Sequence, residues 1–363
     1  MKNVFLLLFL SILVSCTPVI DQSSQNFEVF RGTNIAHWLS QSNRRGLERE
    51  QFITKSDIDA IAAMGFDHVR LPIDEEQMWD ENGSRHDDAF QLMENCINWC
   101  AENNLRVIVD LHILRSHHFN AAEKPLWTDP AEQEKFYDLW RDLSSSLSKY
   151  PNGRVAYELM NEAVADDPEL WNNLVANALA AIRELEPERT IVVGSNRWQS
   201  VDTFDELKIP ENDKNILLSF HFYEPFLLTH WNASWTQLKG YTGPAHYPGV
   251  ILTEEEFATL PEEMQEQVKN WVGKSFDKQW ILEKWSKPMQ LAEKLGLPLY
   301  CGEFGVIAGP DEEDRLNWYR DMVDLFEETG IGYANWNYKS GSFGFILEEG
   351  KRHQEMIDIL SGK

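Results

Sequence analysis

Basic residues are scarce in this sequence. Lys and Arg number 33 against 59 Asp and Glu, so the formal net charge of the 363 residues is −26 at pH 7. Negative charge of this size repels nucleic-acid phosphates, which excludes a nucleic-acid-binding protein and leaves neutral or cationic partners. Long apolar runs are also scarce. The one at residues 4–14 is too short to cross a bilayer, which excludes a polytopic membrane protein.

The start of the chain has the pattern of an export signal. Lys2 precedes the apolar run, which ends in LVSC at residues 13–16. This ending resembles the lipobox of bacterial lipoproteins and predicts a signal peptide at residues 1–15, a lipidated Cys16 and a polar tether at residues 16–26. The protein would then be exported and anchored to a bacterial membrane, with the outer membrane favoured. An ordinary signal peptide with an incidental cysteine is the alternative.

Cysteine is scarce too, with four in the chain. Three remain beyond Cys16, an odd number that gives no disulfide framework. Cys96 and Cys100 stand four residues apart on an expected helix, a spacing that fits two buried thiols on one face, and Cys301 follows much later. No further ligands stand at zinc-binding spacing near the pair, so no zinc site is predicted there.

No linker rich in Pro, Gly or Ser divides the chain, which favours one domain at residues 27–363. Short apolar or β-branched runs alternate with helical patterns, an order typical of parallel βα units. Strands are expected at 29–34, 68–72, 106–111, 155–160, 190–194, 216–222, 299–302 and 332–336. Eight strands with intervening helices predict an α/β fold, a single-domain (β/α)8 or TIM barrel with long βα loops.

The connections between these strands are mostly helical. Helices are expected at 55–64, 88–103, 131–149, 168–185, 277–295, 312–329 and 355–360. The pattern is weak near 201–207, in the fifth connection. The connection at 223–275 is about fifty residues long and rich in aromatic residues, which predicts an ordered and functional elaboration. The loop at 117–129 is a second, smaller one.

Polar residues stand at the carboxyl ends of the expected strands, where barrels of this kind carry their active sites. They are Arg70, His112, Asn161, Glu162, His221, Tyr223, Glu303 and Trp336. Glu162 and Glu303 follow the fourth and seventh strands, which lie across the barrel mouth from each other. Glycoside hydrolysis needs an acid for the departing oxygen and a carboxylate for the sugar carbon, about 5 to 5.5 Å apart in retaining enzymes. The pair therefore predicts a glycosidase.

Several motifs around these residues resemble those of glycoside hydrolase family 5. YELMNE at 157–162 resembles the Asn-Glu signature of the family, and GEFG at 302–305 resembles its nucleophile signature. Supporting matches are RGTN at 31–34, VRLP at 69–72, DLH at 110–112, HFY at 221–223 and Trp336. The ordered set spans about residues 30–339, and the chain resembles the cellulase-like retaining β-glycosidases of the family, of the bacterial β-glucanase type.

The resemblance implies a role for each matching residue. Glu162 would be the acid/base and Glu303 the nucleophile. Arg70 and the Tyr223 hydroxyl can hold the charge of a nucleophile, whereas the acid must keep its proton near neutral pH. Asn161 would donate a hydrogen bond to the sugar 2-hydroxyl, a contact that strengthens in the transition state.

The remaining matches imply contacts with the sugar. His112 and His221 would position hydroxyls or tune Glu162, and Trp336 would form a flat floor under the sugar ring. Tryptophans in the expected loops on the same side of the barrel are further stacking candidates: Trp38, Trp127, Trp198, Trp231 and Trp235. Trp38, Trp198 and Trp235 among them are taken as substrate-binding residues.

A run of stacking platforms suits an endo-acting enzyme, and the partner expected is a β-linked oligo- or polysaccharide. We favour an endo-β-1,4-glucanase. An exo-acting β-glucosidase or a β-mannanase of the same family is the alternative. No cofactor is expected, and the protein is expected to be a monomer.

Two functions of other classes are alternatives. A metal-dependent barrel hydrolase is suggested by the ten histidines, but such enzymes usually place His-x-His after the first strand and Asp after the last. Here NIAH at 34–37 and WN at 336–337 stand at those places, so no metal site is predicted. A lipid-anchored glycan-binding protein without turnover is disfavoured, because binding alone would not need both Glu162 and Glu303.

Overall fold

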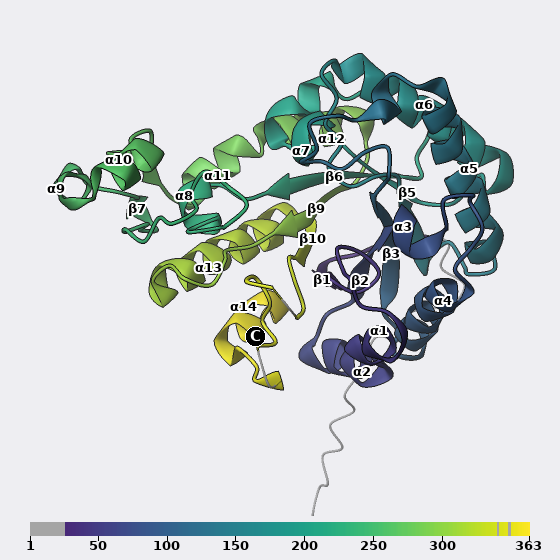
Figure 1. The fold of residues 1–363 in the computed structure, drawn as a ribbon, viewed down its shortest axis with the longest axis horizontal. Helices are drawn as coiled ribbons and strands as arrows, with labels where there is room; N and C mark the ends of the chain where they lie inside the picture. The colour runs from purple at the N-terminus through teal and green to yellow at the C-terminus, as the bar shows by residue number, and fades with distance from the viewer. Residues whose placement is uncertain (1–25, 340, 348–349) are drawn as a thin grey trace, which may run out of the picture.

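A closed barrel of eight parallel strands forms the centre of the molecule (Figure 1). The computed structural model describes residues 26–339, 341–347 and 350–363. The barrel strands are β1 (Arg31–Asn34), β2 (His68–Asp74), β3 (Arg106–Ile113), β4 (Val155–Glu158), β5 (Ile191–Gly194), β6 (Ile216–Phe222), β9 (Leu299–Phe304) and β10 (Gly332–Asn335). Around the barrel they run in chain order, and β10 pairs with β1 to close it. The predicted (β/α)8 fold is confirmed.

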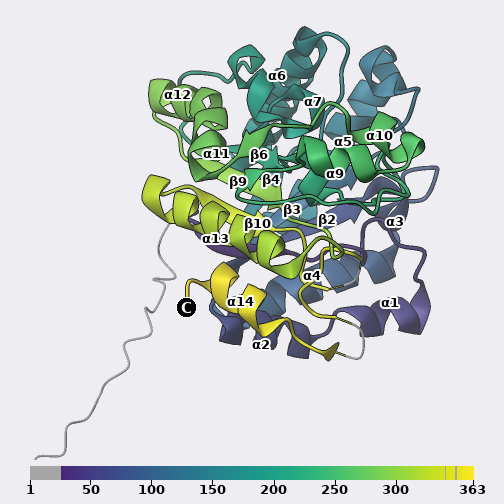
Figure 2. The same cartoon turned by 90° about the vertical axis from the view of Figure 1, so that its left-hand side faces the viewer.

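Helices surround the barrel. They include α1 (Gly46–Phe52), α2 (Lys55–Met64), α3 (Glu75–Met78), α4 (Asp87–Glu102), α5 (Pro130–Leu147), α6 (Pro168–Leu185), α11 (Lys278–Lys284), α12 (Ser286–Leu295), α13 (Glu312–Thr329) and α14 (Gln354–Ser361). The last of these, α14, lies against α13 and near α2, which completes the ring (Figure 2). The fifth connection holds the short segment α7 (Asn196–Gln199) and the 3-10 helix η2 (Val201–Glu206).

One helix expectation was wrong. The helix expected at 277–295 is two helices, α11 and α12, which meet at Trp285. Pro288 explains the break, because it has no amide proton to donate to the carbonyl of Lys284, four residues earlier. The bounds of α2, α6 and α13 are as expected.

The long connection between β6 and β9 is ordered, as its aromatic content predicts. We call residues 223–276 the insertion. It contains α8 (Phe226–Thr229), β7 (Gly249–Val250), α9 (Glu254–Thr259), α10 (Glu262–Val268) and β8 (Ser275–Phe276), with β7 and β8 paired antiparallel. Figure 1 shows β7, α9 and α10 beyond one side of the barrel. Tyr241 and Tyr247 are buried in this part and join its core to that of the barrel.

The interior of the barrel changes from apolar to polar along β3, β4 and β6. Ile108, Ala156, Val192, Leu217, Tyr300 and Ala334 belong to one small apolar cluster. Because alternate residues of a strand face the same side, the next inward positions are polar: Asp110 on β3, Glu158 on β4 and Ser219 on β6. The position after Asp110 and Ser219 on the same face is a histidine in both strands. The sequence thus places polar groups in layers that end at the carboxyl mouth.

The cysteines beyond the export signal are free and buried. Cys96 and Cys100 both lie on the buried face of α4, as their spacing predicts. Cys16 and the proposed signal peptide and tether up to residue 25 lie outside the described residues. Within the described ranges, no helix has the length and apolar character needed to cross a bilayer.

Candidate active site

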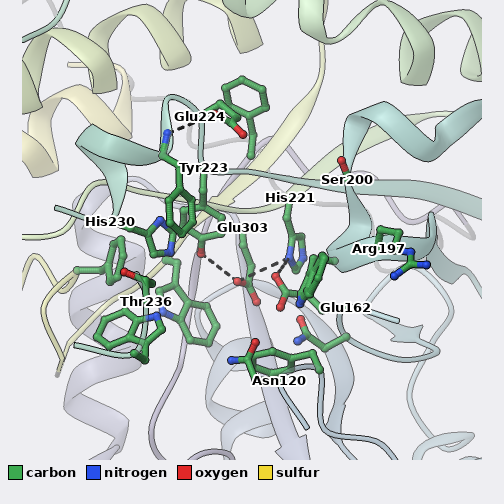
Figure 3. Close-up of a pocket in the computed structure, with 18 of the residues that line it drawn as sticks. Asn120, Glu162, Arg197, Ser200, His221, Tyr223, Glu224, His230, Thr236 and Glu303 are labelled. Atoms are coloured by element: carbon green, nitrogen blue, oxygen red, sulfur yellow. Dashed lines mark hydrogen bonds and ion pairs between the residues drawn. The ribbon is translucent and has the colours of Figure 1, made fainter. Parts of the chain in front are cut away.

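A cleft of about 750 Å³ opens at the carboxyl end of the barrel strands (Figure 3). Glu162 and Glu303 lie near its centre, with Ser200 of the β5 loop to one side and Thr236 of the insertion to the other. The cleft is thus built by the strand ends that the sequence marks as polar and by the longest connection in the chain.

The two carboxylates meet across the barrel mouth. An oxygen of Glu162, an oxygen of Glu303 and a ring nitrogen of His221 all lie within 4.8 Å of one another. A bulge between β6 and β9 pairs His221 directly with Glu303 and so brings these groups together. The spacing fits the roughly 5 Å of retaining glycosidases and is shorter than the roughly 6.5 to 9.5 Å that leaves room for a water in inverting ones.

Glu303 is held as an anion. Arg70 Nη1 lies 2.7 Å from Glu303 Oε1, and the Tyr223 hydroxyl donates to Glu303 Oε2 at 2.9 Å. Each carboxylate oxygen therefore has its own donor, one of them charged. A charge-assisted hydrogen bond of this kind favours the ionised carboxylate.

Arg70 is itself fixed by a buried shell. Its guanidinium makes two hydrogen bonds to Glu158, at 2.6 and 3.0 Å, and an ion pair of 2.9 Å with Asp110. Nη1 also donates to Asn34 Oδ1, and Nη2 donates to Asn161 Oδ1, both at 2.9 Å. With its donors used in this way, the guanidinium has one orientation, and it presents Nη1 to Glu303.

Some members of this shell were not predicted as site residues. Asp110, Glu158 and Asn34 lie inside the quoted motifs without a predicted role, and Gln199, which donates a hydrogen bond to Glu158, lies outside the motifs. Asp110 and Glu158 were detectable, since they occupy the inward face of β3 and β4 two and four positions before polar residues of the mouth. Gln199 offers no such signal, because it lies in an irregular loop after β5.

The two carboxyls of the pair differ in proton affinity. Burial, and then the negative charge of Glu303, raise the pKa of Glu162 well above its usual range. Burial also raises the pKa of Glu303, but there Arg70 and the Tyr223 hydroxyl oppose it. A single proton shared by the pair therefore resides on Glu162, which leaves Glu303 ionised.

The two histidines of the mouth are neutral. Burial lowers the pKa of His112 to about 3 and lowers that of His221 well below its ordinary value. His112 Nδ1 lies 2.7 Å from Asp110, so the proton of this ring is on Nδ1 and Nε2 is left as an acceptor. His221 Nδ1 lies 3.0 Å from Glu162 Oε1, which fixes the position of that carboxyl.

Comparison with known proteins assigns the family. The family model described as Cellulase (glycosyl hydrolase family 5) matches residues 20–342. The chain belongs to glycosyl hydrolase family 5. It is therefore a glycoside hydrolase, and the alternatives of a metal-dependent barrel hydrolase and of a glycan-binding protein without turnover are not supported.

Individual known proteins are similar over most of the chain. Endoglucanase C of Acetivibrio thermocellus is 37% identical over 347 residues, which cover 91% of this chain and 97% of that protein. Cellodextrinase A of Ruminococcus flavefaciens is 30% identical over 307 residues, covering 84% of this chain and 83% of the relative. The crystal structure of endoglucanase Cel5A from the hyperthermophilic Thermotoga maritima is 25% identical, with a TM-score of 0.72, and the match covers 91% of this chain and 96% of that chain.

Apart from Trp38, the tryptophans that were predicted to stack on sugars in this family 5 chain divide into two groups. Trp336 lines the cleft and stacks on His112 with ring centroids 5.6 Å apart and an interplanar angle of 7°. Trp198 and Trp235 also line the cleft and are exposed, at 44% and 56%. Their open indole faces make them the available platforms. Trp127 and Trp231 instead direct their ring N–H groups to the backbone carbonyls of Val164 and Gly243.

The prediction that Trp38 binds substrate was wrong. Its side chain is fully buried in the core between barrel and helices, and its Nε1 donates to the carbonyl of Arg49 at 2.7 Å. A residue without an exposed face cannot stack on a sugar. The sequence placed it in a loop at the catalytic end, but that loop folds inward at this position.

Trp38 is therefore expected to matter for stability. The Trp38→Ala variant leaves a large cavity and an unpaired carbonyl, and it should lower the free energy of unfolding by about 3–5 kcal/mol. Chemical denaturation measures this, with the exposed Trp235→Ala as the matched control, which should change stability by less than about 0.5 kcal/mol. An equal loss in both variants would contradict the assignment of Trp38 to the core.

Glu162, His221 and Glu303 are also the one set of metal-ligating side chains that comes together in the described part of the chain. The surroundings do not suit a cation. Both oxygens of Glu303 already accept hydrogen bonds, and the positive charge of Arg70 lies 2.7 Å from one of them. The contacts of this trio fit an acid and a nucleophile better than a metal centre.

Proposed function

We propose that this family 5 enzyme cleaves internal β-1,4 bonds of a glucan with retention of configuration, with Glu162 as acid/base and Glu303 as nucleophile. The observation that carries the proposal is the pair of carboxyls, whose oxygens lie within 4.8 Å and whose partners differ in kind. Glu303 contacts a cation and a hydroxyl, whereas Glu162 contacts a neutral histidine.

In the first step Glu303 forms a bond to the anomeric carbon as the bond from that carbon to the leaving oxygen breaks. The proton of Glu162 passes to the leaving oxygen, and a glycosyl ester of Glu303 remains. Burial keeps that proton on Glu162 at neutral pH, and the neutral His221 beside it offers no competing charge. Asn161 Oδ1 is engaged by Arg70, which leaves the amide N–H groups to donate to the sugar.

In the second step a water molecule attacks the anomeric carbon and the ester bond to Glu303 breaks. Glu162, now a carboxylate, accepts the proton of the water and regains its starting state. Arg70 and the Tyr223 hydroxyl take up the charge that returns to Glu303. Two inversions at one carbon give net retention.

The choice of substrate is supported by the relatives and by the cleft. Endoglucanase C matches 91% of this chain, and the cleft carries the two exposed platforms Trp198 and Trp235. The similarity to Cellodextrinase A makes short β-glucan chains the second candidate. A β-mannan is the third, since family membership alone does not select the sugar.

A polysaccharide panel with product sizing tests the proposal. Carboxymethyl-cellulose, mixed-linkage glucan, xyloglucan, mannan and xylan are each incubated with the enzyme. We expect the highest rate on a β-1,4-linked glucan, with a rapid fall in viscosity and a mixture of oligosaccharides. Release of glucose or cellobiose alone without a fall in viscosity would contradict endo action, and a preference for mannan would contradict the sugar. Full activity after exhaustive chelation is also expected.

The two exposed tryptophans should contribute to the binding of long chains. Trp198→Ala and Trp235→Ala each remove an apolar face that a sugar ring can cover, and each should raise KM for a long cellooligosaccharide roughly tenfold, about 1.4 kcal/mol. Steady-state kinetics measure this, and phenyl β-cellobioside, which reaches fewer positions, is the control substrate. An equal change for the short and the long substrate would contradict the role as platforms.

We propose, as a separate point, that the protein is exported and anchored through a lipid on Cys16, and that it is a monomer. The apolar run and the LVSC sequence at 13–16 support the anchor. Metabolic labelling with a palmitate analogue should mark the wild type and not Cys16→Ser. A labelled variant, or release of the wild type into the medium, would contradict it. Light scattering of the chain without residues 1–25 tests the monomer.

A further inference from the structure

The loop after β5 contacts Glu162, which follows β4 and is the residue that we propose as acid/base. Glu162 has a backbone φ of +46°, in the left-handed region that a residue with a side chain adopts only when its surroundings enforce it. Its backbone N–H donates to Gln199 Oε1 at 3.0 Å. We infer that Gln199 is a positioning residue, which fixes the backbone of Glu162 so that its carboxyl faces the sugar. This inference rests on the proposed role of Glu162.

The orientation of the Gln199 amide follows from its neighbours. Oε1 faces a backbone N–H, which cannot accept a hydrogen bond, and Nε2 lies 3.2 Å from Glu158 Oε1 and 3.2 Å from Ser219 Oγ, which can. Glu158 accepts a hydrogen bond from Arg70, and Arg70 also donates to Glu303. One side chain therefore connects the supports of both catalytic carboxyls.

Gln199 is also locked in place. It is buried, at 1% exposure, and Arg197, Trp198 and Gln199 all have positive φ, between 53° and 62°. A Cβ atom at Gly194 would lie 2.3 Å from Gln199 Cγ, so only glycine leaves room for this side chain. The turn that directs Gln199 inward also exposes its neighbour Trp198 to the cleft.

Other contacts join the same two loops without reaching Glu162. The N–H of Trp198 donates to the carbonyl of Ala163 at 3.2 Å, and Asn196 both accepts from and donates to the backbone of Ala165, at 2.8 and 3.0 Å. These bonds hold the loop as a whole. Among the contacts between these two loops, the hydrogen bond from the Glu162 N–H to Gln199 Oε1 is the one that restrains the backbone of Glu162, which gives Gln199 a separable effect.

Two aryl cellobiosides that share the same sugar distinguish a loss of acid catalysis from a general loss of activity. Phenyl β-cellobioside needs protonation of its leaving oxygen, whereas 2,4-dinitrophenyl β-cellobioside does not. For each variant we compare kcat/KM for the two substrates, since this constant reports the first chemical step and the ratio is independent of the fraction of folded enzyme. The variants are Gln199→Met, which keeps the length of the side chain, and Gly194→Ala, which displaces it. Gln77→Met is the matched control.

Gln77 is a buried glutamine. Its side-chain amide donates a hydrogen bond to the Ser42 carbonyl and accepts one from Arg49, and these contacts lie away from the cleft. We expect Gln199→Met and Gly194→Ala to lower kcat/KM at least tenfold for the phenyl substrate and less than threefold for the dinitrophenyl one, and Gln77→Met to leave the ratio unchanged. A ratio unchanged in Gln199→Met, with Glu162→Ala showing the split, would overturn the positioning role alone. Absence of the split in Glu162→Ala would overturn the acid role, and the inference with it.

Discussion

Replacement of Glu303 by alanine should lower kcat on a β-glucan by a factor on the order of 10⁵, which is the size of the loss in kcat when a nucleophile is removed. The reason is that Glu303 is the proposed nucleophile, and no other carboxylate in the described part of the chain contacts the same two donors, Arg70 and Tyr223. Azide should restore activity to Glu303→Ala by entering the vacated space. Its attack inverts the carbon once, so the product is an α-glycosyl azide.

A matched control separates this result from a loss of folding. Glu186 is a buried carboxylate remote from the cleft, bonded to Tyr157 and Arg189. Glu186→Ala should lose stability and should show no rescue by azide. A β-glycosyl azide from Glu303→Ala, or the same rescue in both variants, would show that Glu303 is not the nucleophile.

Replacement of Glu162 by alanine should lower kcat/KM by a factor that depends on the leaving group. General acid catalysis contributes about 10²- to 10⁴-fold, so kcat/KM for phenyl β-cellobioside should fall by that factor, while the value for the dinitrophenyl substrate stays within about tenfold. The second step also needs Glu162, so dinitrophenol should appear in a burst followed by a slow phase. Azide should relieve the slow phase and give a β-glycosyl azide.

The pH profile of the wild type tests the assignment of Glu162 as the acid. The pKa of Glu162 is raised, so the acid is protonated at neutral pH, and kcat/KM for the phenyl substrate should fall as the pH rises through that pKa. The fall on the acid side follows protonation of Glu303. The alkaline fall should be absent with the dinitrophenyl substrate. An alkaline fall of equal size with both substrates would contradict Glu162 as the acid.

The position of the proposed catalytic pair was predictable because of the regular geometry of a barrel. Alternation along a strand and the common direction of parallel strands bring every strand end to one mouth, so Glu162 and Glu303 could be placed opposite each other from their positions in the chain alone. The partners of Glu303 followed from the same rule, since Arg70 lies within the predicted strand at 68–72 and Tyr223 follows β6.

Loops do not follow such a rule, and the errors lie there. Trp38 lies four residues after β1 and could have faced either way, and its hydrogen bond to the Arg49 carbonyl is a contact that no local pattern reveals. Gln199 depends on a left-handed turn at 197–199 that contains no glycine or asparagine, the usual signals of that conformation. The break at Trp285 could have been predicted from Pro288. The helical periodicity of 277–295 instead favoured one continuous helix.

The anomeric configuration of the first product tests the central claim most directly, because a carboxyl pair this close should give double displacement. Proton NMR of the reducing end, recorded during the first turnovers of a cellooligosaccharide and before mutarotation, should show the β anomer. Initial appearance of the α anomer would mean that water attacks in one step, and that Glu162 and Glu303 do not act as acid/base and nucleophile.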